Sequence, residues 1–192
     1  MNEDIEIRKM NVKDVVSMRS FGKNKNRLLR SYDFWPRTLT ECAYWYYKKT
    51  EKQDRRYFVA SIKGKIIAYI SSKDIDMDEG TSVLGLVLDP NFQSAGYGKR
   101  IMEKFLELYF EGYGFDEMTL TVDMFNERAI RLYKSLGFKV VGRGYQIFDG
   151  ERWQISKDDE KFFVFKKGRI LSKMWKMKIS YEDFYHEMEE RF

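Results

Sequence analysis

The residues LVLDPNFQSAGYGKRIMEKF, from Leu86 to Phe105, constrain the fold more than any other stretch of this chain. An apolar run stops at Asp89-Pro90, a polar loop follows, and an amphipathic pattern then begins. The stretch therefore predicts a buried strand, a loop and a helix in direct succession. Apolar residues recur with the spacing of one buried helix face, at Ile101, Met102, Phe105, Leu108 and Tyr109.

The loop places Gly96 and Gly98 at the start of the predicted helix. A helix N-terminus has unpaired backbone N–H groups and the positive end of the helix dipole, so a glycine loop leading into it predicts an anion site, most often for phosphate. A Cβ atom on these residues would hold phosphate oxygens away from the amides. No Gly-Lys-Ser/Thr follows, which excludes a P-loop, and the third glycine of a dinucleotide fingerprint would fall at Ile101.

Strands and helices are predicted along the rest of the chain in the order β-α-α-β-β-β-α-β-α-β-β. Residues 56–72 read as a hairpin around Lys63-Gly64-Lys65, and Asn126 opens a helix that ends before Gly137. This order predicts an α/β (α+β) protein with a mixed sheet flanked by helices. At 192 residues, one domain spanning 1–192 is expected, with 181–192 as a C-terminal tail.

Charge and composition exclude several classes of function. The 35 basic and 30 acidic residues are mostly interspersed, and no nucleic-acid motif accompanies the basic segment 161–180, so no nucleic-acid partner is predicted. One cysteine, Cys42, and one histidine, His186, allow neither an intrachain disulfide nor a His/Cys metal site. The N-terminus has no signal-peptide pattern, and no apolar run reaches the roughly 20 residues of a membrane helix. A cytoplasmic protein is expected.

Two motifs resemble the signatures of the GNAT superfamily of N-acetyltransferases. QSAGYG (Gln93–Gly98) is similar to its Gln/Arg-x-x-Gly-x-Gly/Ala loop, and the preceding LGLVLDP looks like the strand before that loop. NERAIRLYKSLGF (Asn126–Phe138) resembles its second signature. The resemblance covers about Ile5 to Ile179. It implies the GNAT fold, a mixed and mostly antiparallel sheet of about seven strands flanked by helices, whose splayed central strand pair binds acetyl-CoA.

The resemblance also implies roles for individual residues. Tyr133 matches the family's usual acid, which protonates the leaving thiolate. A phenol with a pKa near 10 suits that step because it stays protonated at neutral pH. The acetyl-CoA contacts are expected from Leu86, Val87 and Leu88 of the splayed strand, and from Gln93, Ser94, Ala95, Gly96, Tyr97, Gly98 and Lys99 around the pyrophosphate.

Asn126 and Tyr133 lie seven residues apart, which places them on one helix face about 10 Å from each other. A thin ligand along that face would meet the amide near its middle and the phenol at its reactive end. Taken singly, each has a structural interpretation, Asn126 as a plain helix cap and Tyr133 as a core aromatic. Beside the phosphate loop, the functional interpretation is favoured.

The general base departs from the family pattern. Related enzymes tend to carry a glutamate two residues before the glycine that Gly85 matches, and this chain has Val83 there. Glu79 is the candidate substitute in the acidic loop, with Asp78 and Asp76 as alternatives. The amine also has the option of losing its proton to a chain of water molecules.

The predicted function is transfer of acetyl from acetyl-CoA to a primary amine through a tetrahedral intermediate. The acceptor is a protein N-terminus or a small amine such as a polyamine or amino sugar. The ends of the chain resemble the ribosomal-protein-alanine and spermidine acetyltransferase-like subgroup. Residues 146–165 look like an insertion that adds a hairpin near the acceptor site or an oligomer interface, and a homodimer is among the options. The alternative function is a non-catalytic acyl-CoA sensor or interaction protein.

Overall fold

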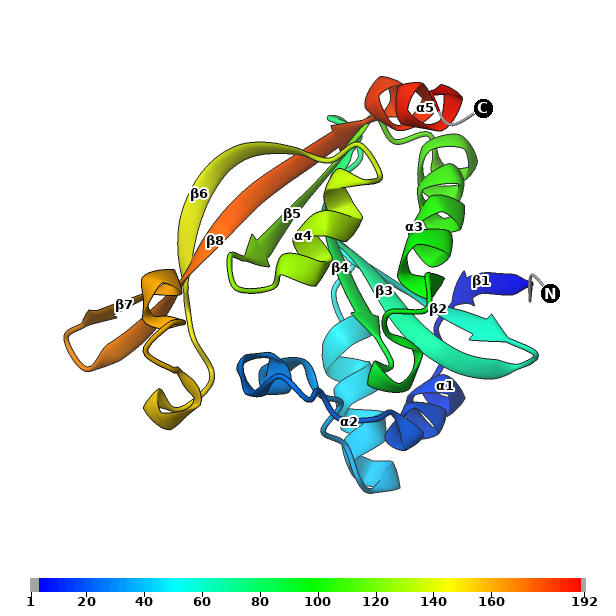
Figure 1. The fold of residues 1–192 in the computed structure, drawn as a ribbon. Coiled ribbons are helices and arrows are strands. Elements are labelled where there is room, and N and C mark those ends of the chain that lie inside the picture. The colour runs from blue at the N-terminus through cyan, green and yellow to red at the C-terminus, as the bar shows by residue number, and fades with distance from the viewer. Residues whose placement is uncertain (1–3, 191–192) are drawn as a thin grey trace. The chain divides into compact units, whose positions relative to one another are not determined.

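The computed structural model of this chain describes residues 4–190. It divides into two compact units. Unit 1 comprises the residues up to Lys23 together with Asp33–Met118, and unit 2 comprises Asn24–Tyr32 together with the residues from Thr119 onward. The expectation of a single domain stays a prediction. Figure 1 shows the elements of both units in chain order.

Unit 1 contains an antiparallel sheet in the order β1-β2-β3-β4. The predicted hairpin joins β2 to β3 and is confirmed, because Ile62 pairs with Lys65. Its two turn residues, Lys63 and Gly64, have φ of 48° and 77°, the positive values that a tight hairpin turn needs. The strands are β1 (Ile5–Lys9), β2 (Arg56–Ile62), β3 (Lys65–Asp76) and β4 (Thr81–Leu88).

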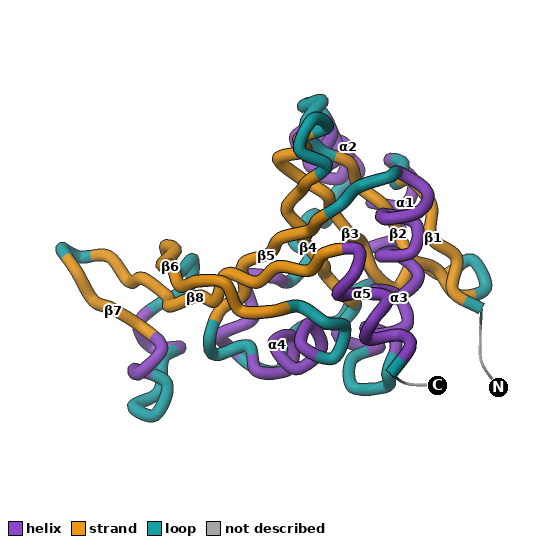
Figure 2. The backbone as a smooth tube through the Cα atoms, turned by 90° about the horizontal axis from the view of Figure 1, so that it is seen from above, coloured by secondary structure: helices purple, strands orange, loops and turns teal. Residues whose placement is uncertain are grey.

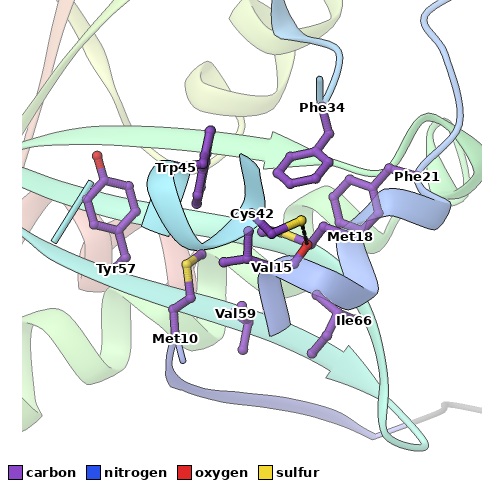
Figure 3. Close-up of a cluster of buried hydrophobic side chains, with 10 residues drawn as sticks. All are labelled: Met10, Val15, Met18, Phe21, Phe34, Cys42, Trp45, Tyr57, Val59 and Ile66. Carbon is purple, nitrogen blue, oxygen red and sulfur yellow. Dashed lines mark hydrogen bonds between the residues drawn. The ribbon is translucent and has the colours of Figure 1, made fainter. Parts of the chain in front are cut away.

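Helices cover both faces of this sheet, because successive side chains of a strand point in opposite directions. Phe58 of β2 contacts Phe105 of α3, with ring centroids 5.3 Å apart. Its neighbours Tyr57 and Val59 belong instead to the cluster in Figure 3, where Trp45 of α2 and Cys42 are also buried. The helices are α1 (Val12–Ser17), α2 (Leu39–Thr50) and α3 (Tyr97–Glu107).

Unit 2 is built around the long strand β8, which pairs with β6 over Lys139–Ile147 and with β7. Figure 2 shows the extended course of β6 and β8 and the β7–β8 hairpin. Within the expected C-terminal tail, Tyr181–Glu189 form a helix, while residues 191–192 lie outside the described residues. The elements are β5 (Glu117–Asp123), whose first two residues belong to unit 1, α4 (Glu127–Lys134), β6 (Lys139–Ile147), β7 (Phe163–Lys166), β8 (Arg169–Ser180) and α5 (Tyr181–Glu189).

The fold class is confirmed as a mixed, mostly antiparallel arrangement of strands flanked by helices, with eight strands among residues 4–190 where the sequence predicts about seven. Within the same residues, no helix is long and apolar enough to cross a membrane.

The predicted insertion forms two short 3-10 helices, Arg152–Gln154 and Glu160–Phe162, before the β7–β8 hairpin. Its packing partner is a distant segment of the same unit, Asn24–Tyr32. Gln154 donates a hydrogen bond to the carbonyl of Arg27 at 2.7 Å. Phe148 and Phe163 pack with Phe125, Leu28 and Leu29 in one aromatic and aliphatic cluster.

The turn after β4 depends on the buried carboxyl of Asp89, which is 0% exposed. Its Oδ1 accepts hydrogen bonds from the backbone amides of Gly22, at 2.9 Å, and of Asn91, at 3.0 Å. The first bond anchors the loop after α1, and the second holds the 3-10 turn Pro90–Phe92 that leads toward α3. One carboxyl oxygen thus fixes where the strand ends.

We expect Asp89→Ala to lower the free energy of unfolding by about 1–3 kcal/mol, because the backbone amides of Gly22 and Asn91 both lose their acceptor. Urea denaturation of the wild type and the variant measures the difference. Asp78→Ala, at an exposed turn position of the same unit, is the control and should change the unfolding free energy little. Equal midpoints for Asp89→Ala and the wild type would contradict the proposed role of the carboxyl.

Candidate functional site

The loop before α3 turns through the left-handed region twice. Ser94 has φ 65°, and Gly96, the N-cap of α3, has φ 79°. A Cβ built on Gly96 would meet no protein atom within 4 Å. Glycine is therefore required here by the backbone conformation, and the space beside it is open to a ligand. The positive φ is thus a second reason for a glycine at position 96, besides the room that it leaves for phosphate oxygens.

The N-terminus of α3 has no side-chain cap. Its first backbone bond within the helix runs from the amide of Arg100 to the carbonyl of Gly96, at 3.3 Å. The amides that precede Arg100 have no carbonyl acceptor inside the helix, as at every helix start. Lys99 adds a positive charge in the first turn, with its Nζ 3.9 Å from Glu103. The arrangement suits an anion such as a diphosphate.

The other residues of unit 1 that are predicted to contact acetyl-CoA lie directly before this loop or within it. Leu86, Val87 and Leu88 form the end of β4 and are half-buried. In the β3–β4 ladder they lie opposite Ile70, Tyr69 and Ala68. Gln93 ends the 3-10 turn that joins the strand to the loop, and Ala95 and Tyr97 flank the glycine N-cap.

Glu79, the candidate base, lies in the exposed turn before β4. Its backbone amide donates to Asp76 at 2.9 Å, which belongs to the geometry of the turn. The phosphate loop starts at the opposite end of β4, beyond Leu88. At about 3.3 Å per residue, the strand separates the two by roughly 23 Å. The role of Glu79 as the base stays a prediction.

Asn126 caps α4 in unit 2. Its side-chain oxygen accepts a hydrogen bond from the amide of Ala129 at 3.3 Å, so the interpretation as a helix cap is confirmed. This bond uses the oxygen of the amide group and leaves the side-chain nitrogen out of the cap. The capping role is thus compatible with a ligand contact at the nitrogen.

Tyr133 is buried, with 7% of its surface exposed, and its ring packs at 5.5 Å from that of Phe138. Burial raises the pKa of Tyr133 to about 12 because the phenolate would be poorly solvated. The phenol is therefore fully protonated at neutral pH. A group in this state can donate a proton but cannot accept one, as the acid role requires.

A polar pocket in unit 2 was not anticipated from the sequence. It is lined by Ser31, Tyr32, Asp123, Gln146, Ile147, Phe148 and Asp149. Asp123, at the end of β5, is 2% exposed. Tyr32 and Ser172 donate hydroxyl hydrogen bonds to its carboxylate at 2.7 and 2.6 Å, and Gln146 donates to both carboxylate oxygens at 3.1 Å.

One residue that lines the pocket, Tyr32, interacts electrostatically with Tyr133. Tyr32 is 38% exposed overall, but its hydroxyl end is directed to Asp123. Burial of that end, followed by the charge and the hydrogen bond of Asp123, raises the pKa of Tyr32, and Tyr133 contributes in the same direction. The only sequence signal for this group is an aspartate that ends an apolar strand, which by itself indicates nothing about Tyr32 or Gln146.

Comparison with known proteins identifies the chain's relatives. Residues 26–138 match the family described as Acetyltransferase (GNAT) family. An uncharacterized N-acetyltransferase, YokL, derived from the SPbeta prophage of Bacillus subtilis, is 26% identical over 143 residues, which cover 73% of this chain and 79% of that protein. The spermidine N(1)-acetyltransferase of Escherichia coli is 27% identical over 97 residues, which cover 50% of this chain and only 52% of the relative.

Solved structures show the same fold. The spermidine N-acetyltransferase from Vibrio cholerae, in complex with CoA and spermine, superposes with a TM-score of 0.70. The match covers 94% of this chain and 98% of the other at 18% identity, a level at which the likeness concerns the fold.

We expect the ionisation of Tyr133 to lie at unusually high pH. The phenolate absorbance that Tyr133→Phe removes should develop as the pH rises toward about 12, beyond the ordinary tyrosine range near 10. Because the folded-state pKa is raised, the protonated phenol contributes stability that is complete below a pH of about 10 and is lost as the pH rises further. An absorbance titration with circular dichroism as the check on folding measures this. A difference already complete near pH 10 in folded protein would contradict it.

Proposed function

This chain belongs to the acetyltransferase (GNAT) family, and on that premise we propose that it transfers the acetyl group of acetyl-CoA to a primary amine. The observation that carries the proposal is the uncapped N-terminus of α3 behind the left-handed turn at Gly96. It leaves backbone donors beside open space, and the diphosphate of acetyl-CoA supplies the matching anion.

Each unit contributes distinct roles to this proposal. In unit 1, the amides from Ser94 to Lys99 bind the diphosphate, and backbone groups of Leu86–Leu88 bind the pantetheine arm and the thioester carbonyl. Fixed backbone N–H groups suit a developing oxyanion because they need no reorganisation. In unit 2, the side-chain nitrogen of Asn126 contacts the pantetheine arm. Tyr133 is the acid.

The proposed reaction is a direct transfer. The neutral amine nitrogen forms a bond to the thioester carbonyl carbon, the C–S bond breaks, and the thiolate takes the hydroxyl proton of Tyr133. The proton that the amine loses passes to water, and the Tyr133 phenolate recovers a proton from solvent. The raised pKa of Tyr133 makes its phenolate a strong base, so this recovery is favourable.

The acceptor proposed here is a small amine of the polyamine type. One relative is named a spermidine N(1)-acetyltransferase, and the solved structure with the same fold contains spermine. These two proteins support a polyamine as one acceptor class of the family. The match to the Escherichia coli enzyme spans about half of that enzyme's length. The choice of acceptor therefore has to rest on residues of this chain.

We expect Tyr133→Phe to reduce turnover by about 10²–10⁴-fold, the usual contribution of a positioned acid. Its affinity for acetyl-CoA should stay near that of the wild type. Release of CoA thiol over a panel of amines measures turnover, and calorimetric titration measures affinity. Tyr44→Phe, at an exposed position of α2, is the matched control. An unchanged rate for Tyr133→Phe would remove the acid role, and acetyl-CoA binding without turnover on any amine would favour a CoA sensor.

We expect Gly96→Ala to weaken acetyl-CoA binding. Gly64→Ala is a close control because Gly64 has φ 77°, against 79° for Gly96, and neither glycine has a protein atom near the position of an added Cβ. Both substitutions should cost about 1 kcal/mol of stability through backbone strain. Only Gly96→Ala should lower acetyl-CoA affinity. Equal affinities in the two variants would contradict the assignment of this loop to the donor.

A further inference from the structure

We infer that the pocket around Asp123 binds the acceptor through a positively charged amino group, with Asp149 at its rim available to a second one. This inference rests on the proposed function and deepens it, because it names the residues that select an aliphatic diamine or polyamine. All of them belong to unit 2.

Asp123 organises the polar groups that line the pocket. The hydroxyl hydrogen of Tyr32 and the side-chain NH₂ of Gln146 are both directed to its carboxylate. Their remaining polar atoms, Oη of Tyr32 and Oε1 of Gln146, are acceptors. Oη of Tyr32 also lies within hydrogen-bonding reach of the Gln146 side chain and keeps a further lone pair, and among residues 4–190 no donor is directed to Oε1 of Gln146, so both oxygens can accept from a ligand that carries donors.

The charged residues that line the pocket are all acidic. Asp123 and Asp149 line it, and no lysine, arginine or histidine does. Within the described residues, Asp123 receives its hydrogen bonds from neutral groups and forms no ion pair. A buried carboxylate without a cation is costly, and a ligand ammonium group would supply the missing charge. An ammonium also carries three N–H donors, which match the acceptor oxygens of Tyr32, Gln146 and the rim.

The size of the pocket favours a slender aliphatic ligand. Its volume is about 130 Å³, room for roughly four water molecules at about 30 Å³ each. An amino group and a few methylenes fit this space, and Phe148 and Ile147 offer apolar surface for the methylenes. The exposed Asp149 lies where a second ammonium group would emerge from the pocket.

Two further contacts tie this pocket to the proposed reaction and to the insertion. Tyr133 affects the ionisation of Tyr32, so the proposed acid lies within electrostatic reach of the pocket. Phe148 and Asp149 are the first residues after β6, and the insertion is anchored to residues 24–32 through Gln154 and Arg27. The insertion thereby fixes one wall of the acceptor pocket, which gives it a function near the acceptor.

Direct binding of amines tests this inference separately from catalysis. Calorimetric titrations use putrescine, butylamine and the uncharged butanediol as probes of the wild-type protein without acetyl-CoA. We expect putrescine to bind more tightly than butylamine and butanediol not to bind. Binding of putrescine with no acetyl transfer to any amine would overturn the proposed function and leave the pocket assignment standing. Acetyl transfer with equal affinities for putrescine and butanediol would overturn the pocket assignment and leave the proposed function standing.

Two substitutions probe the two carboxylates. Asp123→Asn should weaken putrescine binding at least about tenfold and raise the amine KM, with acetyl-CoA affinity unchanged. Asp149→Asn should weaken putrescine several-fold and butylamine hardly at all. Asp158→Asn, at an exposed position of the same insertion, is the control for both.

The exposed position of Asp149 keeps the test decisive if Asp123→Asn fails to fold. Wild-type putrescine affinity in folded Asp123→Asn would assign that carboxylate a structural role only and overturn the inference. An Asp149→Asn variant that loses putrescine and butylamine affinity equally, or neither, would overturn the assignment of the second ammonium group.

Discussion

The proposed acetyl-CoA site depends on the backbone amides at the start of α3, which no side chain caps. The chain arrives at this helix through a left-handed residue, Gly96, that offers no side chain as a cap. Upstream, Asp89 ends β4 by holding two backbone amides with one carboxyl oxygen, so the loop starts from a fixed point. A helix start that the protein leaves without a cap is a place for an external anion.

A second buried carboxyl has the corresponding effect in unit 2. Asp123 draws the donors of Tyr32, Gln146 and Ser172 toward itself, and the groups that face the pocket are consequently acceptors. Two aspartates that follow or end apolar strands thus have different tasks. Asp89 shapes the backbone, whereas Asp123 sets the polarity of a pocket. Their sequence contexts are alike, and only their partners distinguish them.

Local patterns allowed much of the fold and of the donor loop to be predicted. The hairpin at Lys63-Gly64, the cap at Asn126 and the family itself are confirmed, because each depends on residues adjacent in sequence. The sequence indicated an insertion at residues 146–165, but its two 3-10 helices and their attachment to Arg27 were not predicted. That attachment joins residues 127 positions apart, and no local pattern reports it.

The sequence by itself determined the strand, loop and helix around Gly96, since a glycine pair between an apolar run and an amphipathic helix has few alternatives. It also placed Tyr133 in a signature but could not give its environment. Tertiary structure alone decided that the phenol is buried with a raised pKa, and that Tyr32, Asp123 and Gln146 share one pocket. These properties arise from desolvation and from contacts between distant segments, and both exist only once the chain is packed.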